Sequence, residues 1–154
     1  MRTFLLTLLI TSLFIGCAQQ NAFEKFHFTG VKELSEDSIQ TLKIKKATTT
    51  QGIITVVYLN KVLPKLYKDN EYFYVYYYIK DKNDTVSFTL NGNPSLLQEE
   101  LKSENDFSYL TSFTAPWNKY YLLGFQKEGN VLNLKIKTSK AASATLKFVK
   151  DKVN

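Results

Sequence analysis

The sequence predicts an all-β protein, an antiparallel sandwich of two sheets that is immunoglobulin-like and carries one short helix near residues 95–102. Two observations support this fold class. Hydrophobic and polar residues alternate in several short segments, which is the pattern of half-buried strands. Turn-forming residues separate these segments at intervals of roughly ten residues, as in β-sandwiches. A small lipocalin-like barrel is the alternative fold, because it would produce the same pattern.

The predicted strands follow one another along the whole second part of the chain. In the first, Leu42 and Ile44 alternate with lysines. The segment 53–59 is a continuous run rich in β-branched residues, so we expect a strand buried on both faces. Alternating patterns predict further strands within 72–79, 86–90, 107–117, 132–137 and 144–148. The connection 127–130 is short enough for a tight hairpin, since Gly129 can adopt the positive φ that such turns need.

One segment has a helical pattern instead. Ser95 and Gln98 have the spacing of a capping box, and leucines at Leu96, Leu97 and Leu101 follow on one side. We therefore expect one or two helical turns here, lying across a sheet edge.

The first seventeen residues have the features of an export signal. Arg2 supplies a positive charge, and the apolar run 4–15 is shorter than the roughly 20 residues that a membrane-spanning helix needs. Gly16 then precedes Cys17, the single cysteine of the chain. This arrangement predicts a secretory signal peptide.

The last residues of this signal, Leu13-Phe14-Ile15-Gly16-Cys17, resemble the lipobox of bacterial lipoproteins. The resemblance implies that residues 1–16 are removed and that Cys17 carries fatty acyl groups such as palmitate, on its sulfur and on its new amino terminus. Ala18 does not match the family's inner-membrane retention signal, which implies the outer membrane, facing the periplasm or the cell surface. An ordinary secretory signal is the alternative. The implied division is a removed signal at 1–16, a lipidated cysteine and tether at 17–38, and the β-sandwich domain at 39–154.

Composition narrows the function of the mature chain. Its 138 residues suffice for one hydrophobic core, which must hold the domain without an internal disulfide because Cys17 is assigned to the lipid. The net charge of +6 of the full chain falls to +5 in the mature chain, because Arg2, the one arginine, leaves with the signal and every remaining basic residue is lysine. Nucleic-acid recognition relies heavily on arginine, so we expect no nucleic-acid partner.

Side chains that commonly perform catalysis or bind metals are scarce. The single histidine, His27, lies in the predicted tether, and the single thiol is assigned to the lipid. We therefore predict a non-enzymatic protein with no cofactor and no metal site. A carboxylate-based hydrolase is a remote alternative, because acidic residues gather at Glu99, Glu100, Glu104 and Asp106.

The segment 72–79 is the most unusual one in the chain. Alternate side chains of a strand point to opposite faces, so one face of this strand is an ordinary apolar core face. The other face carries four tyrosines, here called the tyrosine ladder: Tyr72, Tyr74, Tyr76 and Tyr78. If exposed, the ladder predicts binding of a protein partner in the cell envelope or, alternatively, of a glycan or other small ligand. The tether, the predicted helix or neighbouring strands with lysine stems would otherwise cover it.

Overall fold

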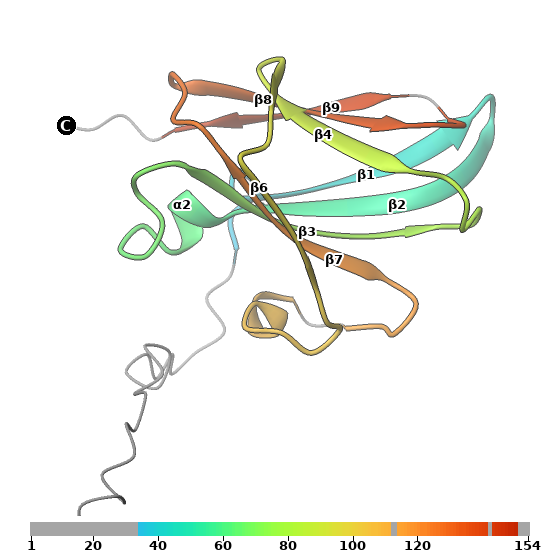
Figure 1. Cartoon of the computed structure of the whole chain (residues 1–154), viewed down its shortest axis with the longest axis horizontal. Coiled ribbons are helices and arrows are strands. Elements are labelled where there is room, and N and C mark those ends of the chain that lie inside the picture. Colours follow the sequence, from blue (N-terminus) through green and yellow to red (C-terminus); the bar gives the residue numbers. More distant parts are fainter. Residues whose placement is uncertain (1–33, 112–113, 142, 151–154) are drawn as a thin grey trace, which may run out of the picture. The chain divides into compact units, whose positions relative to one another are not determined.

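The computed structural model describes residues 34–111, 114–141 and 143–150. These residues form two antiparallel sheets packed face to face, open at their edges (Figure 1). The predicted β-sandwich is therefore confirmed, and the lipocalin-like barrel is wrong. The strand order differs from that of immunoglobulin domains, in which the second strand neighbours the first and the fifth; here β2 lies between β1 and β3.

Sheet A contains five strands in the order β1-β2-β3-β7-β6. Their bounds are β1 Ile39–Lys46, β2 Thr49–Tyr58, β3 Glu71–Ile79, β6 Leu97–Leu101 and β7 Lys119–Phe125. Sheet B has the order β5-β4-β8-β9. Its strands are β4 Val86–Leu90, β5 Asn93–Pro94, β8 Val131–Thr138 and β9 Ala144–Val149. A short α-helix, α2 Leu59–Val62, follows β2 directly, and a 3-10 helix, η3 Ser108–Leu110, precedes β7.

The main core lies between the two sheets and follows the alternation of the sequence. In β8, buried Leu132, Leu134 and Ile136 alternate with exposed residues. The ring of Phe73 on β3 lies across the core from that of Phe148 on β9, with 5.4 Å between their centroids. The β-branched run of β2 is buried from Ile54 to Tyr58, Thr55 included, because both faces of that strand are covered.

The helix predicted at 95–102 is wrong. Residues Leu97–Leu101 form strand β6, which pairs with β7 at the edge of sheet A. The amide of Leu96 already donates to the carbonyl of Gly124, at 2.7 Å. A row of backbone partners along β7 thus outweighs a local capping signal, since helical propensity is a weak preference that tertiary contacts override. The short helix of the fold is α2 instead.

Two further local predictions are also wrong. The connection 127–130 is not a hairpin, because β7 belongs to sheet A and β8 to sheet B. A tight turn lies instead at Asn91-Gly92 between β4 and β5, where both φ angles are positive, 48° and 90°, as a type I′ hairpin turn requires. The described part of 107–117 forms η3 and loops rather than a strand.

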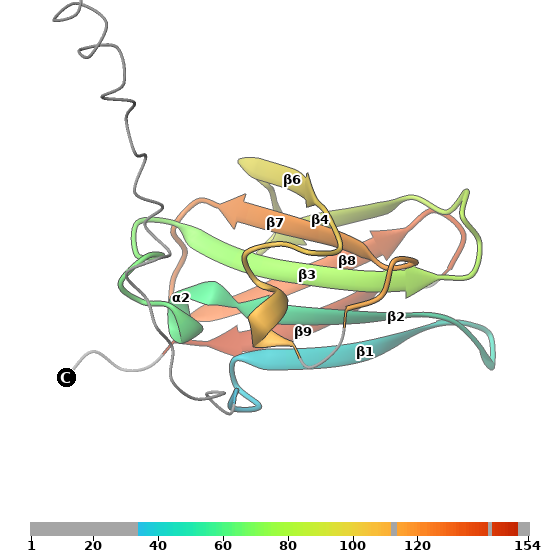
Figure 2. The ribbon, with the colours of Figure 1, turned by 90° about the horizontal axis from the view of Figure 1, so that it is seen from below.

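The two ends of sheet A have different surroundings. At one end β1 begins and β2 leads into α2; this is called the tether end, because the chain enters the domain there. At the other end β3 finishes and β7 starts; this is called the distal end. Figure 2 shows α2 and the η3 segment lying over the outer face of sheet A, the face turned away from sheet B.

Candidate functional site

The outer face of sheet A carries a second hydrophobic cluster, separate from the core between the sheets. It joins outward-facing residues of β2, β3 and β7 to residues of α2, of the loop 63–70 and of the η3 segment. The buried members are Val57, Leu59, Val62, Leu63, Tyr74, Phe107 and Tyr120. The tyrosine ladder lies within this face, so part of it serves as core.

The four ladder tyrosines are exposed to very different degrees. Tyr74 is 0 % exposed, Tyr72 and Tyr76 are half-buried, and Tyr78 is 43 % exposed. The ring of Tyr74 packs on Phe107 and stacks on Tyr120, with centroids 5.1 and 6.4 Å away. Burial raises the pKa of the Tyr74 phenol to about 12. Of the two alternatives, an exposed or a covered ladder, Tyr74 follows the second, and its ring offers no surface to a ligand.

Two loops cover the ladder at the tether end. The ring of Tyr67, from the loop 63–70, lies 4.9 Å from that of Tyr72. The second loop is held by Asn105, whose side-chain amide donates to the Lys102 carbonyl at 2.8 Å and whose side-chain oxygen accepts from the amide of Phe107 at 2.9 Å. Asn105 thereby fixes the turn that places Phe107 on Tyr74. The predicted cover by a helix at 96–101 does not occur, since that segment is β6.

The ladder is open at the distal end. Tyr78 is paired directly with Ile53 of β2, which is 46 % exposed. Trp117 is 63 % exposed and lies at the same end, since Lys119, two residues later, pairs with Tyr77. These three residues, Ile53, Tyr78 and Trp117, are called the distal patch. The sequence indicated Tyr78 alone, because Ile53 lay in a run expected to be buried and Trp117 in a predicted strand.

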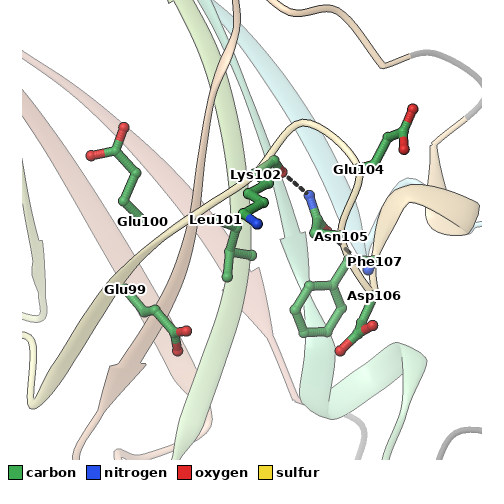
Figure 3. A pocket seen from close by; sticks show the side chains of 8 residues that line it. All are labelled: Glu99, Glu100, Leu101, Lys102, Glu104, Asn105, Asp106 and Phe107. Carbon is green, nitrogen blue, oxygen red and sulfur yellow. Dashed lines mark hydrogen bonds between the residues drawn. The ribbon is translucent and has the colours of Figure 1, made fainter.

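The acidic residues near β6 surround a cavity of about 300 Å³, shown in Figure 3. The carboxylates of Glu100 and Glu104 point to opposite sides in that view. Glu99 and Glu100 are neighbours on one strand and so face opposite ways, and Glu100 accepts a hydrogen bond from the Tyr121 hydroxyl at 3.1 Å. The pairs Glu100 with Glu104 and Glu99 with Glu100 are therefore not arranged as the carboxylate pair used in glycoside hydrolysis is. The described residues contain no group of three or more His, Cys, Asp or Glu placed to hold a metal ion.

An aromatic and acidic patch lies at the tether end of the same face. Burial and the nearby groups of Tyr109, Asp106, Tyr72 and Glu99 raise the pKa of Tyr67 to about 12. Tyr109 is 47 % exposed. Three tyrosine rings and two carboxylates from four segments thus share one surface region, which the linear sequence did not indicate.

A second cavity, of about 310 Å³, opens at the tether end and is called the lysine pocket. It is lined by Tyr58, Asn60, Lys61, Pro64, Tyr67, Lys68, Glu71, Lys127 and Lys150. Glu71 is 1 % exposed. Its carboxylate accepts hydrogen bonds from the Tyr58 hydroxyl at 2.6 Å and the Glu128 amide at 3.1 Å, and it forms an ion pair with Lys150. The lysines come from distant parts of the chain, so no spacing in the sequence predicted this pocket.

No protein-family model, no curated protein and no solved structure matches this chain. Over the described residues, no helix has the length and apolar character needed to cross a membrane. Cys17, the predicted lipidation site, and His27 lie outside the described residues.

Proposed function

We propose that this chain is a bacterial lipoprotein, anchored in the outer membrane through Cys17, whose β-sandwich is a non-enzymatic module that binds a protein partner of the cell envelope. The lipobox-like leader supports the anchor. The observation that supports the partner is the distal patch, which exposes an isoleucine, a tyrosine and the single tryptophan of the chain.

The residue types of the distal patch suit protein binding. Tryptophan and tyrosine dominate binding energy at protein interfaces, because they bury a large area while few torsions become fixed. Lys43 of β1 pairs with Ile53 in the sheet register and supplies a polar border. The patch lies at the end of sheet A away from the point where the tether enters. A partner can therefore reach it while the protein stays anchored.

The partner site is tested by photo-cross-linking in living cells. A benzophenone amino acid replaces Tyr78 in one variant and Tyr109 in another, a tyrosine of similar exposure at the tether end, 47 % against 43 %. We expect a discrete protein adduct from position 78 that is lost when Trp117 is also changed to Ser. Equal adducts from both positions, or none from position 78, would contradict the proposal.

The anchor is tested separately through Cys17. Cells fed a labelled fatty acid should label the wild-type protein, and the protein should fractionate with the outer membrane. The Cys17→Ala variant should carry no label. Label in that variant, or none in the wild type, would refute the lipid anchor without bearing on the distal patch.

Glycan binding is a second candidate function, favoured by the aromatic and acidic patch. Aromatic rings stack on sugar faces, and carboxylates accept hydrogen bonds from sugar hydroxyls. In this patch the carboxylates of Glu99 and Asp106 lie close enough to Tyr67 to raise its pKa. A glycan-array signal that Tyr109→Ala removes and Tyr78→Ala preserves would favour this function over the first.

A further inference from the structure

The lysine pocket has a wall that is positively charged overall. Four lysines line it, and Glu71 is the one carboxylate among its described lining residues. Glu71 forms an ion pair with Lys150 and also accepts from the Tyr58 hydroxyl and the Glu128 amide. This carboxylate therefore compensates Lys150, and Asp37 pairs with Lys61, so the charges of Lys68 and Lys127 remain at the cavity.

The remaining polar groups of the wall are engaged within the protein. The side-chain amide of Asn60 donates to the Asn70 carbonyl at 2.5 Å, and its oxygen accepts from the Tyr72 amide at 2.7 Å. The Tyr58 hydroxyl donates to Glu71. Lys127 donates one hydrogen bond to the Lys68 carbonyl, at 3.4 Å. The groups left to recognise a ligand are thus the ammonium groups of Lys68 and Lys127, compact cations that carry three donors each and bind phosphate as point charges.

The size and the apolar part of the pocket indicate a ligand larger than a simple ion. About 310 Å³ is at the lower limit of small-molecule sites, which favours a phosphorylated headgroup. The ring of Pro64 and that of half-buried Tyr67 add apolar wall beside the lysines. A phosphate with a short organic chain would use both kinds of surface.

The pocket also lies where the chain enters the domain. Lys61 of the pocket pairs with Asp37, just before β1, with 3.6 Å between the charged atoms. The adjoining loop exposes Leu66, at 39 %, between the exposed residues Lys65 and Lys68. An apolar side chain between lysines is typical of segments that settle into the headgroup region of an anionic membrane.

We propose that the lysine pocket binds the phosphate of an anionic lipid headgroup and seats the tether end of the domain on the membrane. The placement on the anchoring membrane rests on the proposed lipid anchor, whereas the phosphate site itself does not. The lysines hold the phosphate, and Leu66 inserts beside it. The distal patch then faces away from the membrane.

The test uses the segment Lys32–Asn154, which contains both hydrophobic clusters and forms a compact unit of its own. Its binding is measured on vesicles of phosphatidylcholine with and without phosphatidylglycerol. We expect binding only with phosphatidylglycerol. The double variant Lys68→Gln/Lys127→Gln should bind about 30-fold more weakly, since each lysine near such a surface contributes on the order of 1 kcal/mol.

A matched variant carries the same change of charge elsewhere. Lys135→Gln/Lys137→Gln alters two exposed lysines on the outer side of β8, and we expect less than a threefold loss. An equal loss of vesicle binding in both double variants would overturn the pocket as the binding site. The attraction to the anionic vesicle would then come from the overall positive charge of the protein. Leu66→Ser should weaken vesicle binding several-fold, and unchanged binding would overturn the insertion.

A lipid headgroup and a small soluble phosphate ester carry the same phosphate group. Soluble glycerol phosphate distinguishes these two sources. If it binds the pocket while phosphatidylglycerol vesicles are not bound, the lipid source is overturned. Because this segment lacks Cys17, its vesicle binding succeeds or fails independently of the acylation experiment. Thermal unfolding of each variant checks that the fold is kept.

Discussion

Tyr74 and Tyr78 are the same residue type on the same face of one strand, yet the first is fully buried and the second is 43 % exposed. The difference arises outside the strand. Phe107 and the turn held by Asn105 lie over Tyr74. Tyr78 lies opposite Ile53 of β2 in the sheet register, and Ile53 is itself exposed. Strand periodicity sets the face of a side chain, whereas its cover depends on loops that arrive from elsewhere.

This contrast assigns different roles to the two ends of the outer face. At the tether end, the tyrosines complete a second hydrophobic cluster and stabilise the domain. At the distal end, the side chains of Ile53, Tyr78 and Trp117 are exposed, and we propose that a partner binds there. The tyrosine ladder thus has a structural part around Tyr74 and, at Tyr78, a part that we propose binds a partner.

The largest expected effect comes from truncating the two tyrosines separately. Tyr74→Ala should lower the free energy of unfolding by about 3–5 kcal/mol, because it leaves a cavity in a packed cluster. Tyr78→Ala should change it by less than about 0.5 kcal/mol, as an exposed substitution does. Urea unfolding measures both. Similar losses from the two variants would break the comparison.

A somewhat smaller effect is expected from the buried carboxylate at the tether end. Glu71→Gln should destabilise the domain by about 3 kcal/mol, since it leaves the Lys150 ammonium in a mostly buried place without its countercharge. Asp81→Asn is the control. Asp81 also forms an ion pair, with 2.7 Å between its Oδ2 atom and the Nζ atom of Lys140, but both side chains are nearly half exposed. An exposed pair is screened by solvent and contributes little, so a control loss as large as that of Glu71→Gln would be a contradiction.

The covered end should also make the domain sensitive to alkaline pH. Burial raises the pKa of Tyr67 and Tyr74 in the folded protein to about 12, from 10.0. Between these values the unfolded chain loses phenolic protons that the folded chain keeps, so stability should fall as the pH rises from 10 towards 12. Melting temperatures across that range test this. Tyr74→Phe should show a shallower fall, and a slope equal to the wild type would contradict the assignment.

The sequence predicted those parts of the fold that local pattern controls. The strict alternation of β8 and of Phe88 and Leu90 in β4 matches their burial. The helix expected at 95–102 failed because the edge pairing depends on β7, whose paired residues lie 19 to 27 positions later in the chain. The hairpin expected at 127–130 failed because a short loop can equally cross from one sheet to the other.

The candidate sites were less predictable than the fold. Alternation placed Tyr78 on the outer face, but it does not tell which tyrosines of that face a loop covers, as Phe107 covers Tyr74. Lys61 and Lys127 meet at one cavity only through the folding of α2 and the β7–β8 connection. Such convergence leaves no spacing in the sequence to detect.

The division of the ladder into a covered and an open end is tested most directly by hydroxyl-radical footprinting of the native protein. Tandem mass spectrometry resolves the oxidation rate of each tyrosine in β3. We predict that Tyr78 is oxidised fastest and Tyr74 most slowly, with Tyr72 and Tyr76 between them. Oxidation of Tyr74 at the rate of Tyr78 would contradict the account.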